Sequence, residues 1–260
     1  MSIAHFFLLL LAGVGAGLTG SVAGLSSLVS YPALLALGLS PLAANVTNTV
    51  GLLSNGPGSA AGARDELRGH GRRLAGLSVW SAVGGGLGAG LLPWGSPATF
   101  KHVVPWLIAL GSVMLLLRDP LRRWLDRRQM VEAAEAATRK PSWGRRLPVL
   151  LVGIYGGYFG AGAGIIMLAV LSLETLEPLP VTNAIKNLTM TAANLVAAVI
   201  FAFASPVDWP AAAAIAIGVL LGSRCGPAVV RAVPDRPLRI VIAVAGIGLA
   251  LALFVGWSGG

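Results

Sequence analysis

GVGAGLTGSVAGLSS occupies residues 13–27 of this chain, and GIYGGYFGAGAG occupies residues 153–164. Clustered glycine and serine lower the preference for helix and allow a backbone to unwind. The first run lies within an apolar segment, residues 3–38, that would measure roughly 54 Å as one helix. Such a helix is too long for one crossing of a bilayer core of about 30 Å and short of two full ones. We therefore expect each run to break its segment, so that the chain bends or turns back.

The composition places the chain in a membrane. Of its 260 residues, 55% are hydrophobic and 11% are charged, and the mean hydropathy is +0.79, whereas about 25% of the residues in a soluble domain are charged. Backbone groups in lipid must be paired within the protein, which apolar runs of this length achieve as helices. The fold class is therefore all-α, a polytopic membrane protein. The N-terminus lacks the basic region of a secretory signal, so we expect the first helix to belong to the fold.

Apolar segments organise the chain into two membrane repeats and a linker. They cover residues 3–38, 41–62, 74–94, 100–117, 147–173, 179–204, 209–227 and 238–257. We expect residues 1–117 to form the first membrane repeat and residues 147–260 to form the second. The long polar stretch between them, residues 118–146, is interpreted as a cytoplasmic linker. It is either an amphipathic helix on the inner leaflet or a solvated linker helix.

The two repeats share positions. Pro41, Asn48 and Asn55 precede Pro180, Asn187 and Asn194 by one constant offset in the numbering, and Gly84 precedes Gly218 by a slightly smaller one. Duplicated halves are a common plan among transporters.

The basic residues indicate how the repeats are oriented. Thirteen of the nineteen Lys and Arg lie in residues 63–73 and 118–146, and four lie between Arg224 and Arg239. If each glycine-broken segment crossed once, the halves would be parallel and those four arginines would face outside, against the tendency of basic loops to stay cytoplasmic. If each broken segment is a hairpin of two short limbs, the halves are inverted and the arginines face the cytoplasm. We favour two inverted repeats, each a hairpin followed by three transmembrane helices, with both termini outside.

Helix ends created by the glycine breaks are the first candidates for a binding site. They expose main-chain amides and a helix dipole at membrane depth, which suits an anion; alternatively, glycine only permits close helix packing. The asparagines of the repeat are the second candidates. Within each helix the pair is seven residues apart and so lies on one face. The amides there either bind a substrate oxygen or join helices at about 0.6 kcal/mol per bond.

Lys186 is the only basic residue inside its apolar segment, residues 179–204. A charge at membrane depth indicates a functional role, here pairing with an anion; alternatively, the side chain extends to the interface. All ten acidic residues lie in loops or at segment ends, so no mid-membrane carboxylate is available for a proton or sodium. Proton-linked transport would then use a protonated substrate or an indirect relay.

Other classes of protein fit these residues less well. The three histidines lie at a terminus or in loops without the spacing of an intramembrane protease, and no phosphate-binding loop supports ATP hydrolysis. Topology accounts for the basic charge, so we expect no nucleic-acid partner. Cys225 stands alone, which excludes an internal disulfide and a cysteine metal cluster. We predict no enzyme activity, catalytic residue, metal or cofactor. A scaffold protein stays open, although it gives no reason for duplicated breaks.

With these residues in view, the chain resembles the sulfite exporter TauE/SafE family, also called the 4-toluene sulfonate uptake permease family, over essentially its whole length. The resemblance rests on the glycine-rich opening of each half, on PLAANVTN at residues 41–48 and PVTNAIKN at residues 180–187, and on the basic central loop. It implies a multi-pass transporter of a bacterial or archaeal inner membrane that carries sulfite, thiosulfate or organosulfonates, with some members carrying small carboxylates. Ser21, Ser26 and Ser27 in the first half stand where the second has Gly162, which questions the equivalence of the half-sites.

We therefore predict a secondary transporter of small sulfur-containing anions that works by alternating access. An anion channel and a carrier of short carboxylates are the alternatives. The expected partners are a small anionic substrate and membrane lipids, and the oligomeric state, with a homodimer as one option, stays open. The predicted substrate-binding residues are Gly20, Gly24, Asn48, Asn55, Gly160, Gly162, Gly164, Lys186, Asn187 and Asn194.

Overall fold

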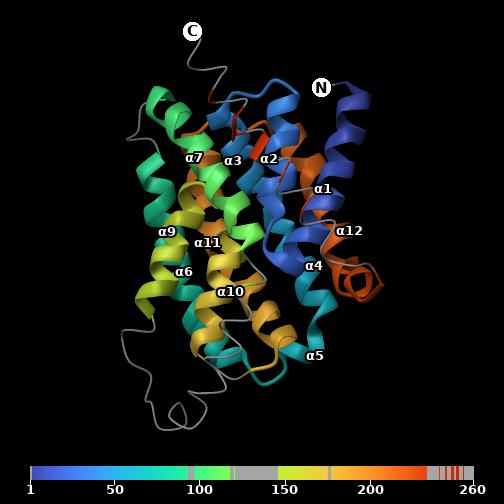
Figure 1. The fold of residues 1–260 in the computed structure, drawn as a ribbon, viewed down its shortest axis with the longest axis vertical. Coiled ribbons are helices and arrows are strands. Elements are labelled where there is room, and N and C mark those ends of the chain that lie inside the picture. Colours follow the sequence, from blue (N-terminus) through green and yellow to red (C-terminus); the bar gives the residue numbers. More distant parts are fainter. Residues whose placement is uncertain are drawn as a thin grey trace.

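The computed structural model describes residues 2–92, 97–117, 146–174 and 177–232, together with position 120 and single positions between 240 and 254. Every regular element within those ranges is helical, and the helices form one bundle (Figure 1). They are α1 (Ile3–Ala23), α2 (Ser26–Ala36), α3 (Pro41–Gly51), the 3-10 helix η1 (Leu52–Ser54), α4 (Asn55–Gly62), α5 (Arg64–Leu67), α6 (Gly71–Leu91), α7 (Pro97–Leu116), α9 (Arg146–Tyr158), α10 (Ala163–Glu174), α11 (Leu179–Ala204) and α12 (Trp209–Ala232). The linker expected at residues 118–146 and the last expected segment, residues 238–257, lie outside the described residues except at single positions and Arg146.

The first glycine run ends a helix and starts a hairpin. Gly24 adopts a φ of 73°, which glycine tolerates without steric cost, and its N–H donates to the Gly20 carbonyl at 2.9 Å. α2 then returns toward the end of the bundle at which α1 began (Figure 1). The expected break is thus present but late in the run. The expectation of two short limbs is wrong for α1, whose 21 residues span about 31 Å.

The second glycine run makes a wider turn. α9 has 13 residues and α10 has 12, so both limbs of this hairpin are short, as expected. Between them, Gly160 and Gly162 adopt φ values of 77° and 72°. In Figure 1 this hairpin enters and leaves the bundle at the end opposite to that of α1 and α2.

The two asparagine-bearing segments differ in their backbones. α11 is continuous over 26 residues, whereas its counterpart in the first half is interrupted by η1 between α3 and α4. A 3-10 helix turns about 120° per residue instead of about 100°. Three such residues add roughly 60° of rotation, so positions on either side of η1 do not share the face that an unbroken helix would give them.

Glycine-to-backbone contacts hold the long helices together. α1 packs along α12, where Gly13 lies against Gly218, and α6 packs along α9, where Gly84 lies against Gly153. The two pairs are alike, because Gly13 and Gly153 each begin a glycine run and Gly84 and Gly218 are the positions matched in the sequence. Small residues let helix backbones approach closely in a membrane. These contacts also explain why Gly13 and its neighbours stay helical instead of breaking α1.

The outward faces of the bundle are apolar. On α6, exposed apolar side chains recur every fourth residue at Val79, Val83, Leu87 and Leu91, which draws a stripe along one helical face. Helices that are long and apolar enough to cross a bilayer cover residues 3–21, 71–91 and 180–204. An apolar surface of this extent is stable against lipid and not against water.

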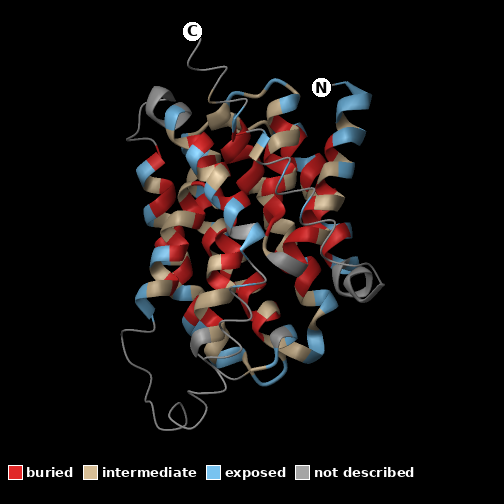
Figure 2. Ribbon diagram, viewed as in Figure 1, coloured by how far each residue is buried: buried red, intermediate tan, exposed pale blue. Residues whose placement is uncertain are grey.

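Buried residues concentrate inside the bundle along its length (Figure 2). The larger of two apolar clusters contains Leu34, Val46 and Phe201, and the smaller contains Leu77, Val149 and Leu171. The smaller cluster draws on the starts of α6 and α9, on the length of α10 and on Ile185 of α11.

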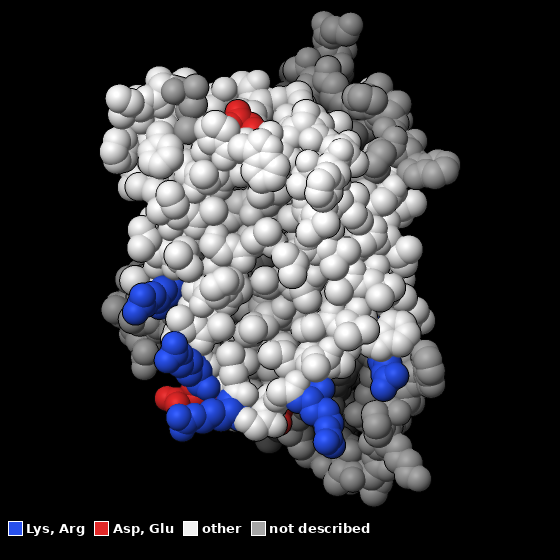
Figure 3. Space-filling view, turned by 180° about the vertical axis from the view of Figure 1, so that it is seen from behind, with Lys and Arg blue, Asp and Glu red and all other residues white. Residues whose placement is uncertain are grey.

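Basic side chains gather at one end of the long axis, where acidic side chains lie among them (Figure 3). Figure 3 shows Lys and Arg gathered over the lower part of the molecule, near the end where α5 lies, and an acidic side chain near the opposite end. Arg224, on α12, is exposed. The N-terminal end of α1 lies at the end opposite to α5 (Figure 1), so the basic end fits a cytoplasmic face and the start of α1 fits the outer face. The C-terminus lies outside the described residues.

Replacing Gly88 by alanine should destabilise the packing of α6 against α9. An added Cβ would overlap the carbonyl oxygen of Ile154, and overpacking of this kind costs about 1–3 kcal/mol. Thermal unfolding of the purified protein in detergent measures the loss. Gly90→Ala is the matched control, since Gly90 lies on the same helix with open space where its Cβ would go; an equal loss in both variants would contradict the packing role.

Candidate functional site

A small cavity lies where the two glycine breaks meet. Its volume is about 50 Å³, room for roughly three to five water molecules at 10–15 Å³ each. Residues from both halves of the chain line it: Gly20, Gly24, Ser26, Ser27, Thr49, Leu52, Asn55, Gly156, Phe159, Gly160, Gly164, Lys186, Asn187, Met190 and Asn194.

Eight of the ten residues predicted from the sequence line this cavity. They are Gly20, Gly24, Asn55, Gly160, Gly164, Lys186, Asn187 and Asn194. The other two lie elsewhere: Gly162 packs against Gly111 of α7, and Asn48 accepts a hydrogen bond at 2.5 Å from the Ser30 hydroxyl on α2. The structure therefore gathers most of the predicted set around one cavity.

Gly24 and Gly164 bring the two breaks into direct contact. A Cβ on Gly24 would lie 2.6 Å from the Gly164 Cα, and a Cβ on Gly164 would lie 2.5 Å from the Gly24 Cα. The contact is reciprocal, and the two glycines are separated along the chain by the same interval as Gly13 and Gly153. Only glycine allows this approach, because any side chain at either position would push the hairpin turns apart.

Side chains of α11 pair with the last carbonyl groups of α1. The Lys186 Nζ donates to the Gly20 carbonyl at 3.3 Å, and Asn183 and Asn187 donate to the Ser21 carbonyl at 2.6 and 3.1 Å. Carbonyls at a helix end have no intrahelical donor and carry the negative end of the helix dipole. They are thus a favourable place for a buried cation, and Lys186 is 1% exposed.

The end of α9 is paired differently. Asn45 of α3 donates to the Tyr158 carbonyl at 2.9 Å, and the Tyr155 carbonyl accepts from the N–H groups of Phe159 and Gly160. The Tyr155 hydroxyl donates to the Ala161 carbonyl at 2.6 Å. The wide turn is therefore held by hydrogen bonds within α9 and the turn and by one side chain from the other half of the chain.

The two halves contribute unequal walls. Position 47 corresponds to 186 at the repeat offset, but Thr47 stands there and its hydroxyl accepts a hydrogen bond from the Asp208 N–H at 3.0 Å. The first half lines the cavity at Thr49, Leu52 and Asn55, every third residue, as the 3-10 turn of η1 dictates. α11 lines it at Asn187, Met190 and Asn194, the spacing of an α-helix. This inequality is the difference between half-sites that the sequence raised.

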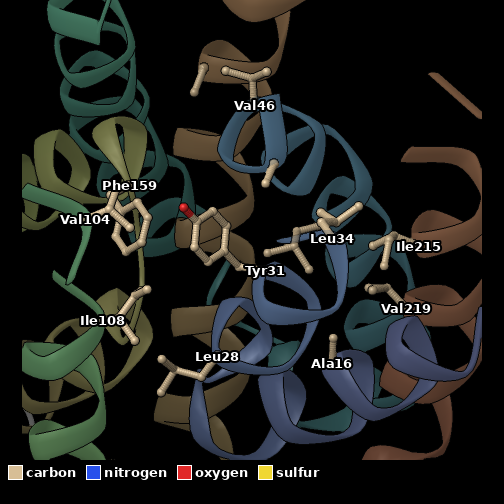
Figure 4. Packing of buried hydrophobic residues seen from close by; sticks show 14 of the residues in the cluster. Ala16, Leu28, Tyr31, Leu34, Val46, Val104, Ile108, Phe159, Ile215 and Val219 are labelled. Atoms are coloured by element: carbon tan, nitrogen blue, oxygen red, sulfur yellow. The ribbon is translucent and has the colours of Figure 1, made fainter. Parts of the chain in front are cut away.

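The predicted set did not include Ser26, Ser27, Phe159 and Met190, which also line the cavity. The serines begin α2 directly after the break, so their place beside the cavity follows once the break is located at Gly24. Phe159 is buried and meets Tyr31 of α2 edge to face, with ring centroids 5.2 Å apart. Figure 4 shows the two rings facing each other across the halves. No pattern in the sequence predicts this pairing.

The lining chemistry suits an anion. It offers one cationic group, two hydroxyl-bearing serines, a threonine and three amides, and it includes no acidic side chain. The buried Oδ1 atom of Asn55 has no hydrogen-bond partner among the described residues. Groups of His, Cys, Asp and Glu that could hold a metal ion are absent from the part of the chain that the structure describes.

A bundle of apolar helices around a polar cavity defines an integral membrane transporter. The chain belongs to the sulfite exporter TauE/SafE family, whose model matches residues 9–253, a family of transporters and not of enzymes. It is 26% identical over 249 residues to probable membrane transporter protein ORF9 of Sinorhizobium sp., covering 94% of this chain and 90% of that protein. It is 27% identical over 251 residues to probable membrane transporter protein YfcA of Escherichia coli K12, covering 92% and 84%. No solved structure matches it.

Asn48→Ala should lower stability with little effect on anion binding. The substitution removes one of two acceptors of the buried Ser30 hydroxyl, which can still donate to the Ser26 carbonyl at 2.9 Å, so the loss is that of one hydrogen bond, about 0.5–1.5 kcal/mol. Asn48 does not line the cavity, so the shift in melting temperature on adding sulfite should match that of the unaltered protein. A sulfite shift that disappears in Asn48→Ala but persists in Ser30→Ala would place Asn48 in the binding site.

Proposed function

We propose that this protein is a secondary carrier of small sulfur-containing anions, with its binding site at the cavity between the two glycine breaks. The observation that carries the proposal is the buried Lys186, the cation in a lining that otherwise offers hydroxyls, amides and glycine backbone. An oxyanion there would form an ion pair with the ammonium group and accept hydrogen bonds from the neutral donors. Charge-assisted hydrogen bonds of this kind are roughly twice as strong as neutral ones.

The size of the cavity favours small substrates within this class. A volume of about 50 Å³ suits an ion such as sulfite or thiosulfate better than an aromatic sulfonate. The side-chain oxygen of Asn55 has no hydrogen-bond donor among the described residues. It could accept a hydrogen bond from an oxyanion that carries a proton, such as hydrogensulfite. Acetate and other short carboxylates share the same chemistry and stay the alternative substrates.

The apolar surroundings of the cavity favour a carrier over a channel. Tyr31, Val104 and Ile108 of the larger cluster lie around Phe159, which lines the cavity (Figure 4). The smaller cluster packs against Met190, which also lines it. Conduction through a continuous pore would need both layers to be wet, whereas a carrier opens one at a time.

We further propose that the two membrane repeats are inverted, in a bacterial inner membrane. Support comes from the opposite directions of the two hairpins in Figure 1 and from the corresponding glycine contacts of α1 with α12 and of α6 with α9. The named relatives are bacterial. Because α12 of the second half packs on α1 and α6 of the first half packs on α9, each moving unit would combine helices from both repeats. The cavity would lie between the units.

Lys186→Met should abolish sulfite binding and transport while the protein still folds. Methionine fills a similar volume without the charge, so the anion would lose its cationic partner. Uptake of radiolabelled sulfite into proteoliposomes, together with the sulfite-induced shift in melting temperature, measures the effect, which should exceed tenfold in apparent affinity, or more than about 1.4 kcal/mol.

Arg224→Gln is the matched control, because it also removes one positive charge but from an exposed position on α12 that does not line the cavity. Counterflow, in which unlabelled sulfite inside the vesicles accelerates entry of the label, separates a carrier from a channel. Equal loss in the two variants would reduce the role of Lys186 to net charge, and full activity of Lys186→Met would overturn the proposed site.

A further inference from the structure

Two carbonyl groups at the end of α1 each accept two hydrogen bonds. The Gly20 carbonyl accepts from the Gly24 N–H at 2.9 Å and from the Lys186 Nζ at 3.3 Å. The Ser21 carbonyl accepts from the Asn183 Nδ2 at 2.6 Å and from the Asn187 Nδ2 at 3.1 Å. A carbonyl oxygen has two lone pairs, so both arrangements are chemically complete.

In each pair, a side chain that lines the cavity makes the longer bond, and the other donor, the Gly24 N–H or the Asn183 amide, makes the shorter one. Lys186 lines the cavity, and Asn187 does so too, whereas Asn183 does not. The side chains that face the cavity thus make the longer bonds of 3.3 and 3.1 Å. Each of these two carbonyls would keep a partner if the cavity-lining side chain turned away from it.

We propose that Asn183 is a positioning residue that holds the Ser21 carbonyl, so that Asn187 is free to transfer its amide to a bound anion. The proposal rests on the proposed function of the cavity. A main-chain carbonyl left without a donor inside a membrane protein is costly. Without Asn183, that cost would keep Asn187 on Ser21, and the anion would have to compete with the helix end for the amide.

Asn183 would therefore act on affinity through Asn187 and not by touching the anion. Its position one helical turn before Asn187 on α11 allows both amides to reach the same carbonyl. In the same way, the backbone N–H of Gly24 holds the Gly20 carbonyl, so that Lys186 is free to turn to the anion. The other break works differently, because a side chain from the first half, Asn45, donates to the Tyr158 carbonyl at 2.9 Å.

A double-mutant cycle on the purified protein tests the proposal. Apparent affinities for sulfite and for acetate would be measured from melting temperatures at increasing anion concentration in Asn183→Ala, Asn187→Ala and the double variant. Each single substitution should weaken binding about fivefold to tenfold, the usual value of one hydrogen bond. The double variant should be no weaker than Asn187→Ala alone, because Asn183 acts only through that amide.

Independent effects that multiply in the double variant would overturn the proposal and leave Asn183 with a merely structural role. Asn183→Ser is a second variant, whose hydroxyl is too short to hold the Ser21 carbonyl and which should behave as Asn183→Ala does. Asn45→Ala, at the other break, is the matched control and should lower stability without this coupling. If Asn187→Ala binds both anions as the unaltered protein does, or the unaltered protein binds neither, the proposed function itself fails. Weak binding by Asn187→Ala with unaltered binding by Asn183→Ala would overturn only the role of Asn183.

Discussion

The carbonyl groups exposed where α1 stops inside the bundle are the constraint on which the site depends. A helix that ends at membrane depth leaves main-chain acceptors that neither lipid nor its own helix can pair. The Gly24 N–H donates to the Gly20 carbonyl, and side chains of α11 donate to the Gly20 and Ser21 carbonyls. The polar residues of α11 are therefore needed for the fold before any ligand arrives, and the same need places a cation and an amide, Lys186 and Asn187, beside a cavity.

Glycine sets the geometry that this constraint requires. Helices that carry Gly13, Gly84 and their partners approach until backbones touch, and this brings the ends of the two hairpins together at Gly24 and Gly164. Because part of the wall there is glycine main chain packed in close contact, the cavity is small, and its polarity comes from a few side chains on α2, α3, α4 and α11. The close packing of the helices and the restriction on ligand size have one cause.

The repeat in the sequence predicted much of this arrangement, since Asn55 and Asn194 occupy matching positions in the two halves and both line the cavity. It failed where the two backbones diverge. η1 adds roughly 60° of rotation between Asn48 and Asn55. Asn48 therefore contacts Ser30 and does not line the cavity. No residue pattern at positions 52–54 predicts a 3-10 turn. The role of Asn183 was hidden for another reason: an amide that serves a carbonyl is recognised only after the break is located to the residue.

The inequality of the halves has an energetic reason within the proposed mechanism. A second lysine at position 47 would place two cations at membrane depth in the empty carrier, and one α1 end could offset only one of them. Thr47 instead holds the start of α12 through the Asp208 N–H, which leaves Lys186 as the cation whose charge the α1 carbonyls offset when no anion is bound. A carrier must cross between its two open states both loaded and empty. A single cation that rests on a helix end in the empty state and on the substrate in the loaded state keeps the cost of both crossings low.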